Sequence, residues 1–206
     1  MKHYLMVDLG TGNSRVALVD SDGGILGLRT YTNVYHRDSA YEDGQYFLPE
    51  DWAALLLQGC RELCREHPDV QVNAVSAAGA RQSFVLLDGN GRAFLGLPNI
   101  DNRGRAYMAQ VPEHDEIYRL SGKWATEDFG AAKLLGLRMQ HPEQYEAVES
   151  VLSLSEWIAW IFTGRKVMEY TQACESQLYD IGQRSWSQTL CSFYGLRPEF
   201  LPPLQA

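Results

Sequence analysis

The sequence lacks the long apolar runs and the positive charge that would direct it to a membrane or to nucleic acid. No run approaches the roughly 18 consecutive apolar residues that a membrane-spanning helix needs. The net charge is −8 over 206 residues, which makes the chain a poor candidate for general nucleic-acid binding. The N-terminus enters a strand pattern at once and carries Asp8, so it does not resemble a signal peptide. We expect no membrane and no nucleic acid as partners.

Cysteine is also scarce. The four cysteines are Cys60, Cys64, Cys174 and Cys191, and none forms a CxxC pair. Cys60 and Cys64 are one helical turn apart, a spacing that suits a shared core face, and no nearby histidine pattern completes a metal site there. We therefore expect reduced, buried thiols and a cytoplasmic protein.

The sequence does contain a compact polar cluster between two apolar runs near its N-terminus. Residues Tyr4–Val7 lead into Asp8-Leu9-Gly10-Thr11-Gly12-Asn13-Ser14-Arg15, and Val16–Val19 follow directly. Two short apolar runs separated by glycine and small polar residues predict a β-hairpin.

The tip of this hairpin has the chemistry of a phosphate site. Gly10 and Gly12 would let backbone N–H groups approach an anion closely, and Arg15 supplies a fixed positive fork. Asp8, at the strand end, is placed to hold a hydrated Mg²⁺ beside that phosphate. Further side-chain donors come from Thr11, Asn13 and Ser14. On these residues alone, an ordinary glycine-rich hairpin with a surface arginine explains the pattern equally well.

The remaining pattern predicts an antiparallel meander, a helix, and then alternating strands and helices. The predicted strands are Tyr4–Leu9, Ser14–Asp20, Ile25–Tyr35, Val70–Ala78, Ser83–Leu87, Ala93–Ile100 and Leu178–Ile181. The predicted helices are Pro49 to the residue before Pro68, Arg103–Val111, Asp115–Ser121, Gly130–Gln140, Pro142–Ala147, Ser155–Thr163 and Ser185–Tyr194. Residues His36–Leu48 show no clear period and predict a loop, and 197–206 predict the start of a linker.

This order resembles the actin-like ATPase domain, which is related to ribonuclease H. It predicts an α/β fold with a mixed sheet and flanking helices. It differs from the Rossmann order, in which the glycine-rich turn joins a strand to a helix. The sequence also has no GxxxxGK[ST] segment.

At the level of motifs, the chain resembles the N-terminal domain of the FGGY carbohydrate kinases over essentially its whole length. Residues 8–15 match the family pattern Asp-x-Gly-Thr-x-x-x-Arg in every fixed position. Further segments resemble family motifs in the same order: Arg81-Gln82, Asn99-Ile100-Asp101-Asn102-Arg103, Lys133–Leu137 with His141–Tyr145, Ser155–Trp157 with Phe162–Gly164, Leu178–Ile181, and Gly195-Leu196 with Leu201–Leu204. The whole of 1–206 is therefore expected to be one sugar- and phosphate-binding domain.

The resemblance implies a kinase that transfers the γ-phosphate of ATP to a hydroxyl of a sugar, polyol or related small carbohydrate. It implies phosphate contacts from Asp8, Gly10, Thr11, Gly12, Asn13 and Arg15, with Asp8 also holding Mg²⁺ through water. It implies substrate contacts from Arg81, Gln82, Asn99 and Asp101. The residues themselves leave two alternatives open. Asp101 would also serve as the N-cap of a helix that starts at Arg103, and Arg81 would also serve as a surface cation paired with an acid.

Two positions depart from the family pattern. Gln82 replaces the usual glutamate, and Asn99 replaces an aromatic residue that often forms the apolar wall of the sugar pocket. Both argue against a glycerol kinase. The sequence Asn99-x-Asp101-x-Arg103 looks more like the autoinducer-2 kinase or xylulokinase-like branch.

No residue of this chain matches the family's catalytic aspartate or its glycine-rich adenine segment. In family members, both of these motifs come after this domain. We therefore assign no catalytic residue, and we expect the chain alone to be inactive. The alternative is a stand-alone or regulatory binding module that kept the fold without catalysis. Monomer and homodimer both remain open.

Overall fold

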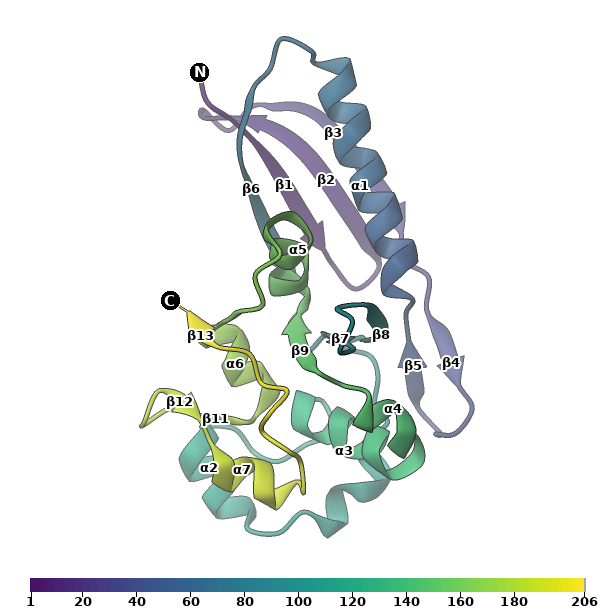
Figure 1. Cartoon of the computed structure of the whole chain (residues 1–206), viewed down its shortest axis with the longest axis vertical. Coiled ribbons are helices and arrows are strands. Elements are labelled where there is room, and N and C mark those ends of the chain that lie inside the picture. The colour runs from purple at the N-terminus through teal and green to yellow at the C-terminus, as the bar shows by residue number, and fades with distance from the viewer. Residues whose placement is uncertain (206) are drawn as a thin grey trace.

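The N-terminal hairpin lies in a four-stranded mixed sheet in the computed structural model, which describes residues 1–205. The strand order is β3-β2-β1-β6 (Figure 1). β1 pairs antiparallel with β2 and parallel with β6. The strands are β1 (His3–Leu9), β2 (Asn13–Asp20), β3 (Ile25–Thr32) and β6 (Val72–Gly79).

Alternation along β1 decides which face of this sheet is buried. Leu5, Val7 and Leu9 are buried, whereas Met6 and Asp8 between them are exposed, as expected for a strand with one covered face. Two helices supply the cover: α1 (Pro49–Glu66), which runs along the sheet in Figure 1, and α5 (Leu154–Thr163). The opposite face stays open and carries Asp8.

A second, antiparallel sheet separates the two main cores. Its order is β8-β7-β9, with strands β7 (Phe84–Leu87), β8 (Ala93–Leu97) and β9 (Ser150–Ser153). All four residues of β7 are buried. Phe84 and Leu86 face the core beneath the remaining helices, and Val85 and Leu87 face the core beneath α1 and α5.

The remaining helices gather around the core that contains Phe84 and Leu86, except the helix over Tyr170–Ser176, whose Ala173 packs in a small third cluster with Met168 and Tyr179. They are the 3₁₀ helix η1 (Arg105–Gln110), α2 (His114–Ser121), α3 (Gly130–Gln140), α4 (Pro142–Glu146), α6 (Tyr170–Ser176) and α7 (Gln188–Phe193). Short strand pairs close the fold: β4 (His36–Asp38) with β5 (Gly44–Tyr46), β10 (Met168–Glu169) with β13 (Leu204–Gln205), and β11 (Tyr179–Asp180) with β12 (Ser185–Trp186). No helix within residues 1–205 is both long and apolar enough to cross a bilayer.

The predicted loop His36–Leu48 is wrong, because this segment forms the β4–β5 hairpin. Each strand has three residues, which is too few to show a period of two in the sequence. The hairpin is anchored from outside: the backbones of Phe47 and Gly96 exchange two hydrogen bonds of 3.0 and 3.1 Å. A long-range contact of this kind leaves no local sequence signal.

Several other boundaries and classes also change. The third strand ends at Thr32, the helix predicted over Arg103–Val111 is the shorter 3₁₀ helix η1, and the helix predicted over Ser185–Tyr194 begins with β12 and continues as α7. The predicted linker over 197–206 contains β13, which pairs with β10. β12 pairs with the nearby β11, whereas β13 pairs with a segment more than 30 positions earlier, which no local sequence pattern could show. Ala206 lies outside the described residues.

The expectation of buried thiols holds for only two of the four cysteines. Cys60 and Cys191 are buried, Cys174 is half-buried and Cys64 is exposed. All four are free thiols. Cys64 therefore does not share the core face of α1 with Cys60. Burial raises the pKa of the Cys60 thiol to about 11, so Cys60 stays protonated near neutral pH.

Gly104 gives a test of how closely η1 must approach α3. A Cβ at this position would lie 2.2 Å from the backbone oxygen of Ala132, and a backbone atom of a helix cannot move aside as a side chain can. We expect Gly104→Ala to lower the free energy of unfolding by about 2 kcal/mol, measured by urea denaturation. Gly89→Ala is the control, because a Cβ there would meet nothing within 4 Å. Equal stability of the two variants would contradict this packing.

Candidate functional site

Two polar segments meet at one end of the four-stranded sheet, because β1 and β6 are parallel neighbours. The register pairs Asp8 with Ala78 and Leu9 with Gly79, so both strands end together. The Ala80 N–H then donates to the Leu9 carbonyl oxygen at 2.7 Å. The turn after β1 and the Arg81-Gln82 segment after β6 therefore leave the same edge of the sheet.

Asp8 and Arg15 form an ion pair on the open face of the sheet. They are opposite each other in the β1–β2 register, and Arg15 Nη1 lies 3.1 Å from Asp8 Oδ2. About half of each side chain is exposed, at 51% for Asp8 and 46% for Arg15. An exposed pair contributes at most about 1 kcal/mol to stability. Both charges thus remain accessible to an ionic ligand.

Residues Gly10–Asn13, which join β1 to β2, form the phosphate turn. It is closed by a hydrogen bond of 3.1 Å from the Gly10 N–H to the Asn13 carbonyl oxygen. Its outer side is open, because a Cβ at Gly12 would meet nothing within 4 Å. Its carbonyl groups accept hydrogen bonds from Asn33 and Tyr35, two residues that sequence reasoning missed. No signal in the sequence marked them, because both fell within the strand predicted over Ile25–Tyr35, which ends at Thr32 in the structure.

Asn99 connects the phosphate turn to the predicted substrate residues. Its side-chain Nδ2 donates to Thr11 Oγ1 at 3.0 Å, and its backbone N–H donates to Ser83 Oγ at 2.9 Å. The structure thus brings Thr11 and Asn99, which are 88 positions apart, into direct contact.

Arg81 and Gln82 lie at the same edge, and among the described residues neither side chain has a hydrogen-bond partner. Within residues 1–205, Arg81 is exposed and makes no hydrogen bond or ion pair, so the alternative of a surface pair with an acid is not what this structure shows. Gln82 has a φ of 61°, a left-handed conformation that costs a non-glycine residue about 1 kcal/mol or more. This conformation fixes the direction in which the chain leaves Arg81.

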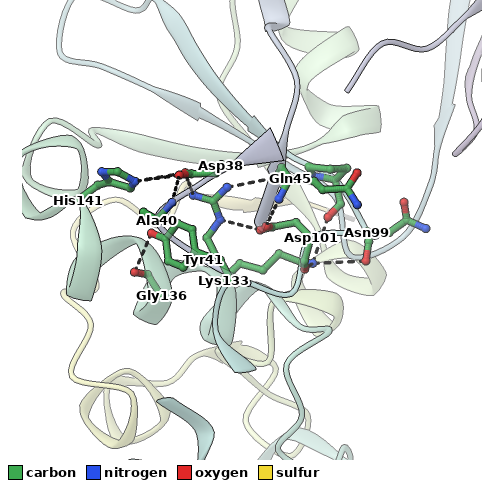
Figure 2. A network of polar contacts seen from close by, with 11 residues as sticks. Asp38, Ala40, Tyr41, Gln45, Asn99, Asp101, Lys133, Gly136 and His141 are labelled. Atoms are coloured by element: carbon green, nitrogen blue, oxygen red, sulfur yellow. Dashed lines mark hydrogen bonds and ion pairs between the residues drawn. The ribbon is translucent and has the colours of Figure 1, made fainter. Parts of the chain in front are cut away.

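Asp101 lies inside the protein next to this edge, in a buried ion pair (Figure 2). The Asp101 side chain is fully buried; its Oδ2 accepts from Arg103 Nε at 2.7 Å and its Oδ1 accepts from the Gln45 N–H at 2.9 Å. Asp101 caps no helix, because η1 starts at Arg105 with Gly104 as its N-cap. In this structure the carboxylate holds Arg103 and the β5 backbone in place.

The Arg103 guanidinium is the centre of this network. It is buried, its Nη2 donates to the Gln45 carbonyl oxygen at 3.1 Å, and its Nη1 lies 3.6 Å from Asp38 Oδ2. Its carbon is 4.9 Å from the centre of the Tyr41 ring, within the range of a cation–π contact. Burial raises the pKa of Tyr41, and its hydroxyl donates to the Gly136 carbonyl oxygen at 3.0 Å.

Lys133 on α3 joins the same network through the loop that contains Asn99 and Asp101 (Figure 2). The side chain is fully buried, and its Nζ donates to the carbonyl oxygens of Pro98, at 3.0 Å, and of Asp101. Burial lowers the pKa of Lys133 to about 8. Lys133 therefore fixes the loop that presents Asn99. Its signal in the sequence was a lysine within an otherwise apolar helix turn.

The geometry of the phosphate turn fits a polyphosphate with Mg²⁺. The open space at Gly12 leaves room for a phosphate, and Arg15 supplies positive charge beside it. No group of three metal-ligating side chains forms within residues 1–205, so a cation would depend on Asp8, water and the phosphate itself. Mg²⁺ is commonly held in this way, by one or two carboxylates together with substrate phosphates.

Comparisons with known proteins show the family to which this chain is similar. The model of the FGGY family of carbohydrate kinases, N-terminal domain, matches residues 3–206. The Bacillus subtilis (strain 168) protein YoaC, classed by its name among sugar kinases, is 39% identical over 98% of this chain and 42% of its own length. The autoinducer-2 kinase of Salmonella choleraesuis (strain SC-B67) is 28% identical over 98% of this chain and 40% of its own length.

Among solved structures, the xylulose kinase from Rhodospirillum rubrum superposes with a TM-score of 0.88 at 18% identity, covering 99% of this chain and 43% of that one. At this identity the likeness shows the fold, which confirms the predicted α/β class with a mixed sheet and flanking helices. The chain spans less than half the length of the curated relatives that it matches.

Lys133→Met tests the role of the buried ammonium group. Methionine keeps most of the side-chain volume but donates no hydrogen bond, so it leaves the carbonyl groups of Pro98 and Asp101 buried without this partner. We expect a loss of about 2 to 3 kcal/mol in the free energy of unfolding, measured by urea denaturation. Lys2→Met, at an exposed position, is the control and should change stability by less than about 0.5 kcal/mol.

The difference in unfolding free energy between the wild type and Lys133→Met should depend on pH. Because the pKa of Lys133 is lowered from 10.5 to about 8 by burial, the unfolded chain holds this proton more tightly than the folded chain. Stability from this group therefore rises with pH between these two values. The difference in unfolding free energy between the wild type and Lys133→Met should widen as pH increases from 8 to 10. A constant difference would contradict the lowered pKa of Lys133 in the folded protein.

Proposed function

This chain belongs to the FGGY family of carbohydrate kinases, and from that premise we propose that it supplies the phosphate-binding and sugar-binding part of an ATP-dependent kinase. The observation that carries the proposal is the contact between Thr11 and Asn99. It joins the phosphate turn to the predicted substrate loop within hydrogen-bond distance. A kinase needs both at one place, because phosphoryl transfer depends mainly on positioning and on stabilising charge.

In this proposal the phosphate turn binds the phosphates of ATP. The N–H groups of Thr11 and Gly12 face the phosphates, Asn13 lies beside them, and Arg15 offsets their negative charge. Asp8 would hold Mg²⁺ through water, and the ion would supply positive charge beside the phosphates. Mg²⁺·ATP supplies the phosphoryl group. The relatives extend beyond the matched segment. We expect two further parts of the kinase in that additional length: the base that takes the proton of the sugar hydroxyl, and the adenine-binding segment.

The substrate we propose is a small carbohydrate bound by Arg81, Gln82 and Asn99. These side chains offer both donors and acceptors, which a polyhydroxylated ligand requires. The amide at Asn99 and the sequence Asn99-x-Asp101-x-Arg103 favour a substrate of the autoinducer-2 or xylulose kinase type over glycerol. Asp101 acts on this site through Arg103 and the loop backbone.

Arg81→Gln tests the sugar site. Arg81 has no partner in the described chain, so its loss should leave the melting temperature of the unliganded protein within about 1 °C of the wild type. A thermal-shift screen of pentoses, hexonates and polyols should give a stabilising ligand for the wild type and a much smaller shift for the variant. Arg61→Gln, at an exposed position of α1, is the matched control. An equal shift in all three proteins would place the ligand elsewhere.

We further expect this chain alone to give no sugar-dependent hydrolysis or transfer from ATP. The reason is that none of its residues matches the family's catalytic aspartate. A coupled assay of ADP formation, with and without each sugar that binds, measures this directly. A burst of ADP that requires the sugar would show that the chain contains its own base.

A further inference from the structure

We propose that Asn33 and Tyr35, which follow β3, are positioning residues that turn the N–H groups of the phosphate turn outward toward the ligand. The inference rests on the proposed function, because it concerns the same site. Neither residue is in the motif that defines the turn. Both reach it from a neighbouring segment more than 20 positions along the chain.

Asn33 binds the turn at three points. Its side-chain Nδ2 donates to the carbonyl oxygen of Gly10 at 2.7 Å and to that of Thr11 at 3.2 Å. Its backbone N–H donates to the carbonyl oxygen of Gly12 at 3.1 Å. All three successive carbonyl groups are therefore engaged by one residue.

The amide of Asn33 is itself oriented by Ser14. The buried Ser14 hydroxyl donates to Asn33 Oδ1 at 2.5 Å. If the amide were reversed, its oxygen would face two carbonyl oxygens and its NH₂ would lose both acceptors. The network is thus satisfied in one orientation only. Ser14 serves this amide and does not face a phosphate.

Tyr35 makes a second hydrogen bond to the Thr11 carbonyl group. Its hydroxyl donates to the Thr11 carbonyl oxygen at 2.6 Å, and burial raises the pKa of Tyr35, which keeps the hydroxyl a donor. The ring packs edge-on against Trp52 of α1, with ring centres 5.6 Å apart. The position of the turn is therefore tied to the core beneath α1.

The consequence follows from the geometry of the peptide unit. In a trans peptide the C=O and the following N–H point in opposite directions. Fixing the carbonyl groups of Gly10 and Thr11 therefore fixes the N–H groups of Thr11 and Gly12 on the other side. Within residues 1–205 these two N–H groups donate to no protein atom, and both residues are exposed. Two adjacent, outward N–H groups form an anion-binding concavity.

Tyr35→Phe tests the inference with magnesium tripolyphosphate as the probe, because this ligand has the phosphates of ATP without adenine. Loss of one orienting hydrogen bond should raise the dissociation constant for magnesium tripolyphosphate about threefold to tenfold, measured by titration calorimetry. The amide NMR signals of Thr11 and Gly12 should shift on titration in the wild type and shift less in the variant. Ser14→Ala, which frees the Asn33 amide, should weaken binding in the same direction.

Tyr31→Phe is the matched control. Tyr31 lies on β3, and its buried hydroxyl has no hydrogen-bond partner within the described residues, so its removal should leave tripolyphosphate binding unchanged. The possible outcomes separate the two proposals. If the wild type does not bind tripolyphosphate, the proposed phosphate site fails and the inference fails with it. If the wild type binds and both Tyr35→Phe and Ser14→Ala bind equally well, only the inference is overturned.

Discussion

The buried ion pair between Arg103 and Asp101 is the constraint on which the site depends. Arg103 and Lys133 bring two positive charges into the interior, and Asp38 and Asp101 balance them. A buried charge without its partner costs several kcal/mol, so these contacts hold the loop containing Pro98–Arg103 in the observed arrangement. That arrangement presents Asn99 to Thr11. The contact between Asn99 and Thr11 thus depends on the buried ion pair between Arg103 and Asp101.

The phosphate turn is built by the opposite means. Its charged residues, Asp8 and Arg15, are half-exposed and contribute little to stability. Its shape comes instead from neutral hydrogen bonds made by Asn33 and Tyr35. This division is useful for a site that meets an anion, because the charges stay accessible to the ligand and the backbone is already in position. Preorganised N–H groups lose little freedom when an anion binds.

The sequence predicted the parts of this protein that depend on local pattern. The first two strands, α1, α2 and α3 follow from alternation or from helical spacing, and the glycine-rich turn follows from its residue types. The β4–β5 hairpin was missed because the Phe47–Gly96 bridge that anchors it joins distant segments. The roles of Asn33 and Lys133 were missed for the same reason: each acts through hydrogen bonds to backbone atoms that no spacing rule relates.

If the chain binds sugar as we propose, the same contrast locates the positions at which its specificity would change. Within residues 1–205 the side chains of Arg81 and Gln82 make no hydrogen bond, and that of Asn99 bonds only to Thr11, so replacing them disturbs few other contacts. Asp101 is different: substitution there would leave the Arg103 guanidinium without its closest counter-charge and release the Gln45 backbone. We therefore expect variation among related chains at the positions of Gln82 and Asn99, the two that depart from the family pattern here. Under the proposed function, the buried Asp101–Arg103 pair would set the frame for the side chains that select a sugar.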